Sequence, residues 1–460
     1  MAVAMETRDS VDLGALMDEA GSFRFQLRLL LLLGCFMFVE GYDMQVLAYA
    51  APAMIKTMHV SKAAFGVVFG GAMAGVMIGA LLLGTLGDTY GRKLLVIGGL
   101  SLFGIFNFMT IAAPDMTMLM VLRTIAGIGL GGAVPNAIAL MVDYAPTRRR
   151  AVAVCLLYIG YNIGAALGGV IAARMIPAWG WQSVFVLGGI MPLGLAAVLA
   201  LVLPESVRFL SLRGRQAAAR ALLARMRPDL ALGPDTRILV TEEARQGVPV
   251  RHLFTEGRAL MSALLRLGAI GTIMTEHFMT SWLPMVLTAG GIGLAKAVTA
   301  SAVMLTVGTF GSIAIGFAIE RFGIVALAVL VVLGVPSVVA LGHVGGDEGL
   351  LMVLAGAAGF FLIGGLTGMN ILASTIYPTY MRSTGAGWAN AMSRIGAIVG
   401  PVLGGVLLSF DLSLQAIFAT AAIPAAIGAL AIFVLSRLRV ANEQRAVRAV
   451  QGTSRLQAQG

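Results

Sequence analysis

Two carboxylates lie within an apolar stretch of the sequence, FMFVEGYDMQVLAYAAP at residues 36–52. Glu40 and Asp43 are three residues apart, so on a helix they share one face. Like charges this close repel each other where the dielectric constant is low, which favours the binding of a proton to one of them. Ionisable side chains inside membrane-spanning helices are costly and usually functional. The pair is therefore predicted to bind and release protons; the alternative is a structural pair that neighbouring helices satisfy.

Two arginines also lie in apolar segments, Arg123 and Arg394. A guanidinium group offers planar, paired donors that match a carboxylate. Arg394 is predicted to bind a substrate carboxylate. Arg123 is predicted either to do the same or to be the fixed partner of Glu40, Asp43 or Asp143.

A second acidic position, in TEHFMTSWLP, places Glu276 beside His277. Histidine titrates near neutrality, so a His–Glu relay could contribute to proton transfer. Adjacent side chains point about 100° apart on a helix, however. The alternative is that one of the two faces a neighbouring helix as a hydrogen-bond partner.

Six further side chains in apolar segments are candidates for substrate contact. Amides hydrogen-bond a substrate or hold two helices together, and aromatic rings stack on a bound ring or pack within the protein. These candidates are Asn136, Asn370, Tyr42, Tyr158, Tyr161 and Trp388.

The composition identifies the medium around these residues. Hydrophobic residues make up 58% of the chain, charged residues only 12%, and the mean hydropathy is +0.91. A soluble domain is nearer half apolar and a quarter charged, so an integral membrane protein is predicted. At roughly 35 residues for a span and its loop, 460 residues suggest about a dozen helices. The apolar runs are continuous rather than alternating, which favours helices over a β-barrel.

The predicted spans form two sets of six, which gives an all-α polytopic fold of two six-helix bundles. The first set is 27–49, 64–84, 94–113, 117–141, 151–173 and 182–203, and the second is 261–288, 297–318, 324–343, 351–376, 384–408 and 414–436. The predicted domains are an N-terminal tail (1–26), a first bundle (27–203), a central loop (204–260), a second bundle (261–436) and a C-terminal tail (437–460). The two halves also repeat each other, as transporters with substrate near the membrane midplane do.

The net charge of +10 is concentrated in loops between apolar runs, so no nucleic-acid partner is expected. The basic loops are 85–93, 142–150, 204–260 and 377–383, with the tail after 436. Positive loops stay on the cytoplasmic side, which predicts that both termini are cytoplasmic.

Residues 1–26 lack the features of a secretory signal. Cys35 and Cys155 both lie in apolar runs, so neither a disulfide framework nor a thiolate metal cluster is expected.

The loop after the second span, GTLGDTYGRK, has glycines for a tight turn, an acid for the positive end of the next helix, and two cations for the cytoplasmic side. The alternative is an ordinary basic connecting loop. A related stretch, GFAIERFG, follows the eighth span. The predicted gating residues of these and two neighbouring loops are Gly84, Asp88, Gly91, Arg92, Lys93, Asp143, Arg382, Glu320 and Arg321.

The pattern G-x-L-x-D-x-x-G-R-K in this position resembles the signature of the major facilitator superfamily. Within it, EGYDMQ, RTIAGIGLGGAVPNA and YPTYMRSTGAGWANAMSRIGAIVGP look like the aromatic acid:proton symporter family, and LPESVRFL and SWLP also fit. The resemblance covers residues 20–436. That family usually carries D-G-F-D where this chain has Glu40, Gly41, Tyr42 and Asp43, which changes the first acid and the aromatic side chain.

The resemblance implies a secondary transporter of the bacterial inner membrane that acts as a monomer. It would import an aromatic or related catabolic carboxylate, such as a benzoate, hydroxybenzoate, phenylpropionate or muconate, together with protons by alternating access. Two alternatives are a proton-coupled exporter and a transporter that doubles as a chemoreceptor. An enzyme is not expected, and neither is a cofactor or a metal, because the cytoplasmic segments show no nucleophile–base motif, phosphate loop or metal cluster.

Overall fold

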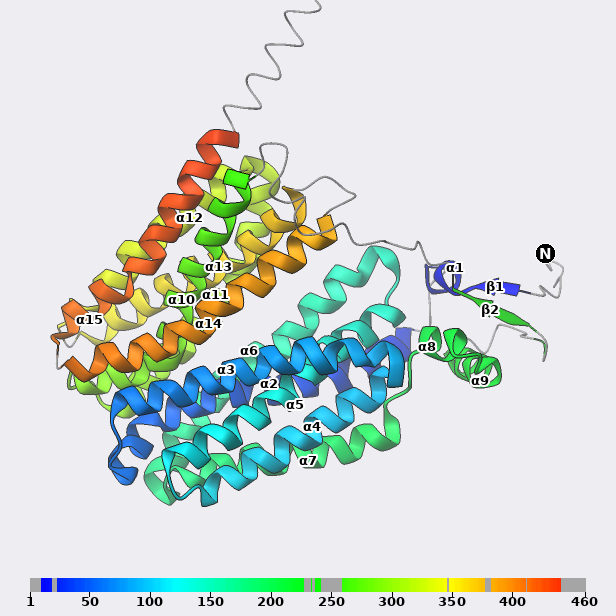
Figure 1. The fold of residues 1–460 in the computed structure, drawn as a ribbon, viewed down its shortest axis with the longest axis horizontal. Coiled ribbons are helices and arrows are strands. Elements are labelled where there is room, and N and C mark those ends of the chain that lie inside the picture. Colours follow the sequence, from blue (N-terminus) through cyan, green and yellow to red (C-terminus); the bar gives the residue numbers. More distant parts are fainter. Residues whose placement is uncertain are drawn as a thin grey trace, which may run out of the picture. The chain divides into compact units, whose positions relative to one another are not determined.

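The fold is given by a computed structural model that describes residues 10–18, 23–226, 233, 236–240, 259–345, 347–376, 382–410 and 412–439 (Figure 1). Within these ranges, 12 helices are long and apolar enough to cross a membrane. Such helices satisfy their backbone hydrogen bonds internally, which a lipid environment demands. The predicted all-α, twelve-span architecture is confirmed. The chain divides into two units, Met1–Val60 with Val67–Arg245, and Ser61–Gly66 with Gln246–Gly460.

Unit 1 carries the first six spans, except that residues 61–66 at the start of the second span belong to unit 2. Its membrane helices are α2 (Phe23–Met58), α3 (Lys62–Tyr90), α4 (Arg92–Met109), α5 (Met116–Tyr144), α6 (Arg150–Trp179) and α7 (Gln182–Val202). Short 3-10 turns η1 (Thr110–Ala112) and η2 (Thr147–Arg149) follow α4 and α5. Helix α2 packs along α6, and α4 packs along both α5 and α7.

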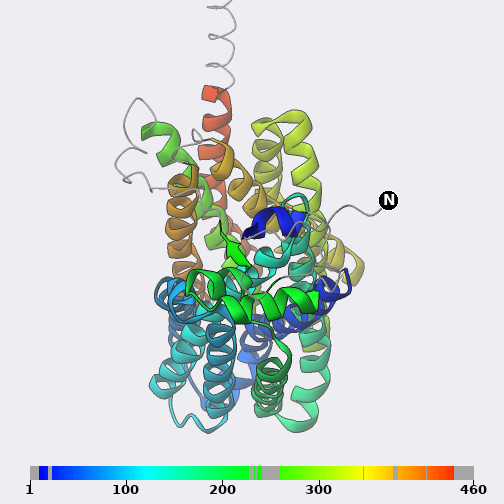
Figure 2. The same ribbon diagram turned by 90° about the vertical axis from the view of Figure 1, so that its right-hand side faces the viewer.

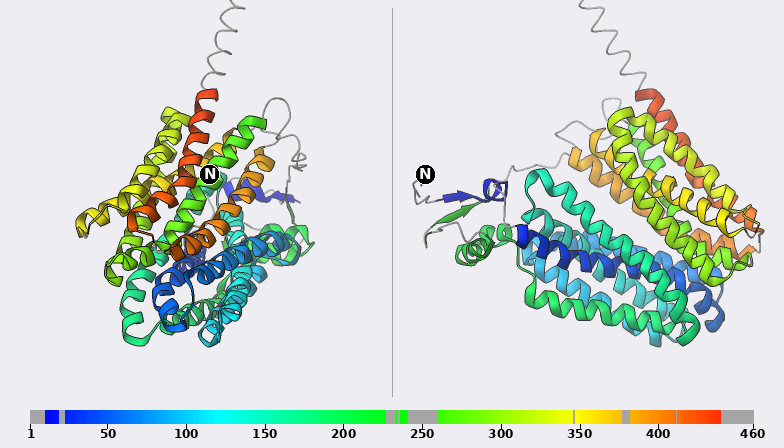
Figure 3. Two further views of the ribbon diagram at one scale, coloured as in Figure 1. Left: turned by 60° about the vertical axis from the view of Figure 1, so that its left-hand side comes forward. Right: turned by 180° about the vertical axis from the view of Figure 1, so that it is seen from behind.

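Unit 2 repeats this arrangement. Its helices are α10 (Ala259–Ala289), α11 (Leu294–Phe322), α12 (Ile324–Leu341), α13 (Glu348–Thr375), α14 (Arg382–Leu407) and α15 (Leu414–Ala421), with a 3-10 turn η5 (Leu408–Phe410). After a turn at Ala422, residues 423–439 continue helically, so the last span is Leu414–Arg439. The right-hand view of Figure 3 shows these helices side by side.

The same pairs of spans pack closely in both units. The first and fifth spans of unit 1, α2 and α6, correspond to α10 and α14 of unit 2. In both pairs, glycines let one helix rest against the backbone of the other: Gly41 on Tyr161 in unit 1, and Gly400 on Met274 in unit 2. The repeated halves predicted from the sequence are therefore present as repeated packing.

A small subdomain lies at one end of the unit 1 helices (Figures 1 and 2). It consists of β1 (Ser10–Asp12), α1 (Leu13–Asp18), α8 (Val207–Leu212), α9 (Gln216–Met226) and β2 (Arg237–Leu239). Strands β1 and β2 pair in parallel, with Val11 opposite Ile238. Leu13, Leu16 and Leu223 are buried in the same apolar core as residues of α2 and α5.

Helix boundaries differ from expectation chiefly at polar loops. Helix α2 begins at Phe23 rather than at residue 27. Helix α3 continues through the expected loop as far as Tyr90, and only Gly91, with φ 105°, ends it. Hydropathy marks where a helix becomes polar, whereas the hydrogen-bonded helix continues until a residue leaves helical geometry. Residues 204–260, expected as a loop, include α8, α9 and β2.

Candidate functional site

The centre of unit 1 holds a buried ion pair between the first and fourth spans. The two guanidinium nitrogens Nη1 and Nη2 of Arg123 each donate to one carboxylate oxygen of Asp43, at 3.0 Å. Both residues are only 4% exposed. A paired fork of this kind is the strongest geometry for a carboxylate and an arginine. Of the three partners that the sequence allowed for Arg123, the structure therefore selects Asp43.

Two further side chains hold the guanidinium group of Arg123. Nη1 also donates to the side-chain oxygen of Asn107, whose own amide nitrogen donates to the carbonyl of Gly188 at 2.7 Å. The guanidinium carbon lies 5.8 Å from the ring centroid of Phe185, within cation–π range. Asn107 and Phe185 were not among the residues predicted from the sequence. The available indication was a lone amide inside an apolar span, which is costly unless it is bonded.

Close helix contacts set the position of the pair. On α5, Gly127 and Gly131 rest against the backbone of α3, which brings the helix of Arg123 inward. On α2, Gly41 rests against the carbonyl oxygen of Tyr161 on α6. Because small residues allow helix axes to approach, the charged side chains between them are held in one geometry.

The first acid and the aromatic residue of the EGYD stretch occupy different environments. Glu40 is partly buried, nearly one turn before Asp43 on α2. Tyr42 is fully buried, and its hydroxyl donates to the carbonyl of Val184 on α7 at 2.8 Å. Tyr42 therefore joins α2 to α7 in this structure.

The tyrosines of α6 lie near each other. The ring centroids of Tyr158 and Tyr161 are 6.4 Å apart with planes at 66°, an edge-on arrangement. Tyr158 is exposed and Tyr161 is partly buried. The structure thus brings together two of the four predicted ring-stacking candidates.

Asn136 joins two helices of unit 1. Its amide nitrogen donates to the carbonyl of Leu83 on α3 at 3.3 Å and to that of Gly132 on its own helix at 2.8 Å. The side-chain oxygen lies against Gly87, where a Cβ atom would overlap it. Asn136 is 2% exposed, so it stabilises the contact between α5 and the glycine-rich end of α3.

The loop after α3 corrects one expectation. Asp88 was expected at the positive end of the following helix, but it lies in the last turn of α3 and is exposed. Glu205 takes that place: its Oε1 accepts from the backbone nitrogens of Arg92 at 3.1 Å and of Lys93 at 3.2 Å. A carboxylate at a helix N-terminus is stabilised by the free amide groups and the dipole. Gly91 leaves room for it, because a Cβ there would meet the Glu205 carboxylate.

Arg92, at the start of α4, connects this helix to α3, to α5 and, through its backbone nitrogen, to the segment before α8. It forms ion pairs with Asp88 at 3.2 Å and with Asp143 at the end of α5, and it donates to the carbonyl of Ala139 at 2.9 Å. The hydroxyl of Ser206 donates to Asp143 and also caps α8. Glu205 and Ser206 belong to the LPESVRFL stretch, so this stretch and GTLGDTYGRK form one network.

In unit 2, Glu276 and His277 contact each other on α10 through a carboxylate oxygen and Nδ1. Glu276 is buried and His277 partly buried. The two side chains are therefore close neighbours, but these two atoms do not form a hydrogen bond. Arg394 lies on α14, partly buried. Among the described residues it has neither an ion-pair nor a hydrogen-bond partner, whereas Nη1 and Nη2 of Arg123 are both bonded.

The remaining predicted residues of unit 2 lie in varied places. Asn370 is exposed on α13, whereas Asn136 of unit 1 is buried. Trp388 packs against the apolar core of unit 2. Glu320 and Arg321 are exposed in the last turns of α11. Arg382 begins α14, but its side chain lies outside the described part of the chain, as do residues 377–381 of the expected basic loop.

Known proteins resemble this chain along most of its length. A profile of the Major Facilitator Superfamily matches residues 33–347. A gallate transporter of Pseudomonas putida is 36% identical over 418 residues, which cover 89% of this chain and 92% of the relative. A 4-hydroxybenzoate transporter of Acinetobacter baylyi is 32% identical over 440 residues, covering 93% and 95%. The crystal structure of a bacterial homologue of the human lysosomal transporter Spinster, inward-facing and occupied, has a TM-score of 0.72 at 16% identity, covering 91% of this chain and 98% of that chain.

Proposed function

We propose that this chain, which belongs to the major facilitator superfamily, imports an aromatic carboxylate together with protons by alternating access. It is a multi-pass membrane protein, and its relatives are transporters of aromatic acids rather than enzymes. Their substrates, gallate and 4-hydroxybenzoate, share a ring and a carboxylate. This common chemistry supports an aromatic carboxylate as the substrate class.

The buried pair of Asp43 and Arg123 is the observation that carries the proton-coupling proposal. An ion pair out of water is stable only while both charges are present, because an unpaired buried charge is strongly destabilised. Protonation of Asp43 leaves the positive charge of Arg123 without its counter-ion. That charge then favours a nearby anion, so proton and substrate carboxylate each favour the binding of the other. Asn107 and Phe185 keep the guanidinium in place during the exchange of partners.

Other titratable and basic side chains have proposed parts in the same cycle. Arg394 binds the substrate carboxylate, which its lack of a partner among the described residues supports. Glu40 and the Glu276–His277 pair take further protons, supported by their burial within spans. More than one proton would make import of a monovalent anion electrogenic, and the membrane potential would then supply roughly 2.3 kcal/mol per net charge per 100 mV.

The network around Arg92 is the proposed lock of the cytoplasmic side. It links the ends of α3 and α5 to the start of α4 and to the segment before α8 through ion pairs and a helix cap. These ion pairs and the helix cap form only when the helix ends occupy one particular arrangement. They therefore suit a gate that alternates between a closed and an open state. With this loop cytoplasmic, both termini are cytoplasmic as well.

Uptake into proteoliposomes tests the proposed function. With an inward proton gradient, radiolabelled 4-hydroxybenzoate or gallate is expected to accumulate above the outside concentration, and collapse of the gradient by a protonophore should release it. Loss of preloaded substrate under the same inward gradient would identify a proton-coupled exporter instead. Competition by a panel of aromatic acids then identifies the preferred ring substituents.

Removal of the charge of Arg394 is expected to weaken substrate binding. Arg394→Gln should raise the dissociation constant for an aromatic carboxylate by about tenfold or more, because a hydrogen bond to a charged group contributes ~1.5–3 kcal/mol. Thermal stabilisation of the purified protein by substrate measures this constant. Arg174→Gln, at an exposed arginine of α6, is the matched control. An unaltered affinity in Arg394→Gln would assign the carboxylate to Arg123.

A further inference from the structure

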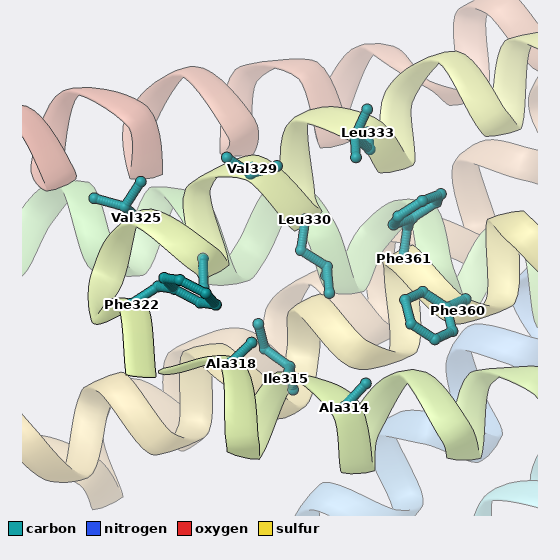
Figure 4. Close-up of a pocket in the computed structure, with 11 residues that line it drawn as sticks. Ala314, Ile315, Ala318, Phe322, Val325, Val329, Leu330, Leu333, Phe360 and Phe361 are labelled. Carbon is teal, nitrogen blue, oxygen red and sulfur yellow. The ribbon is translucent and has the colours of Figure 1, made fainter. Parts of the chain in front are cut away.

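An apolar groove of about 420 Å³ lies on unit 2 along α11, α12 and α13 (Figure 4). Its lining combines small residues that leave space with aromatic rings that form the walls. The small residues are Ala314, Ala318 and Ala326, and the rings are Phe322, Phe360 and Phe361. Every lining side chain is apolar. The groove therefore suits a hydrocarbon and has no feature that would bind a carboxylate substrate within it.

The groove opens towards the surroundings of the helices rather than into the core of the unit. Phe322, Val325, Val329 and Leu333 line it and are exposed. All three helices are candidate membrane spans, so the medium at this surface is the acyl-chain region of the bilayer. An acyl chain that enters the groove supplies dispersion contacts that an empty groove lacks.

The dimensions of the groove match one leaflet. Figure 4 shows Phe322 and Val325 near one end and Leu333 and Phe361 near the other. From Phe322 back to Ala314 on α11 the chain rises by about 12 Å at 1.5 Å per residue. The hydrocarbon core is ~30 Å thick, so one leaflet is ~15 Å deep. The length of the groove is thus comparable with the depth of one leaflet.

An arginine side chain lies beside the end of the groove that is formed by the last turn of α11. Arg321 is exposed in the last turn of α11, and its guanidinium carbon lies 5.5 Å from the ring centroid of Phe322. Guanidinium groups bind phosphates in paired geometry. The neighbouring carboxylate of Glu320 is also exposed, which favours a headgroup that carries an ammonium beside its phosphate.

We propose that this groove is a phospholipid-binding site, in which one acyl chain lies along α11 and α12 and the phosphate binds Arg321. Transfer of a chain from bulk lipid to the groove gains no hydrophobic free energy, because both surroundings are apolar. Affinity above that of bulk lipid therefore depends on two terms: packing against the small residues of the groove, and the charge-assisted contact with the phosphate. Each term can be removed separately.

Native mass spectrometry of the full chain in detergent tests this site, with phosphatidylethanolamine as the titrated probe. The wild type is expected to retain one lipid at least tenfold more tightly than the others. Ala318→Trp should abolish this tight binding by filling the groove, and Arg321→Gln should weaken it about tenfold. Diacylglycerol with the same chains should bind no more tightly to the wild type than to Arg321→Gln.

Matched controls come from another exposed face of unit 2. Arg437 lies over the ring of Phe433, 5.6 Å from its centroid, and neither residue lines the groove. Arg437→Gln and Leu430→Trp, at an exposed leucine, should retain the lipid as the wild type does. Should Ala318→Trp prove unstable in a thermal melt, Ala326→Leu fills the same groove with fewer atoms. The proposal would be overturned if the groove-filling variant retained phosphatidylethanolamine as tightly as the wild type does. Equal binding of diacylglycerol and phospholipid to the wild type would also overturn it.

Discussion

Asp43→Asn is expected to abolish accumulation of an aromatic carboxylate against its gradient while leaving exchange of internal for external substrate. Asparagine keeps the size of the side chain and a hydrogen-bond acceptor for Arg123, but it takes up no proton and has no charge to lose. The variant therefore resembles the protonated state throughout the cycle, and binding of the substrate is no longer coupled to binding of a proton.

Two measurements in the same proteoliposomes separate coupling from movement of substrate. Accumulation under an inward proton gradient should fall to the level of empty liposomes if Asp43 carries the coupling. Counterflow exchange, which needs no net proton movement, should persist. Accumulation at the wild-type level in Asp43→Asn would exclude Asp43 from proton coupling and move that role to Glu40 or Glu276.

The matched control is Asp115→Asn, at an aspartate outside the buried pair. Asp115 caps α5 by accepting from the backbone nitrogen of Met118 at 2.8 Å. Asparagine caps a helix about as well as aspartate, so this variant should transport normally. Asp43→Glu is the second comparison, because it keeps a titratable group opposite Arg123 and should restore part of the accumulation.

Gly41→Ala is expected to destabilise unit 1 strongly, although it adds only one methyl group. A Cβ at Gly41 would overlap the backbone carbonyl oxygen of Tyr161, and backbone cannot rotate away as a side chain can. Helices α2 and α6 must separate to admit the methyl group. Overpacking costs about 1–3 kcal/mol, and contact with rigid backbone places Gly41→Ala at the upper end of this range.

Thermal unfolding of the full chain in detergent measures the effect, which corresponds to a lowering of Tm by roughly 10 °C at 2–4 °C per kcal/mol. Gly34→Ala is the matched control on the same helix, since no heavy atom lies within 4 Å of a Cβ there. Its Tm should remain unchanged or rise slightly, because alanine favours helix more than glycine does. Equal melting of the two variants would show that α2 and α6 do not approach as closely as the structure has them.

The membrane fold could be predicted almost completely from the sequence. A bilayer allows only segments that satisfy their own backbone hydrogen bonds, so length and apolarity are enough to locate spanning helices. The ends of the helices were harder to predict from the sequence. Helix α3 continues through a polar stretch that hydropathy marks as a loop, because the conformation of Gly91, and not polarity, ends it.

The members of the candidate site could be predicted in part. Charges inside apolar segments are costly, so Asp43, Arg123 and Glu276 stand out in the sequence itself. Asn107 does not, because an uncharged amide in a span is as often a helix contact as part of a site. Its importance became visible only through its hydrogen bond to the Arg123 guanidinium.

By itself, the sequence determined that this is a twelve-span protein with repeated halves, and which titratable side chains lie inside the membrane. Tertiary structure decided the pairings: Asp43 with Arg123 across 80 residues, and Glu205 with the backbone at Arg92 across 113. The physical reason is the distance over which each of these effects acts. Hydropathy and charge act through the surrounding medium, residue by residue, whereas an ion pair or a helix cap requires atoms within about 3 Å. That distance depends on how closely neighbouring helices approach, which in this chain is set by glycines such as Gly41 and Gly131.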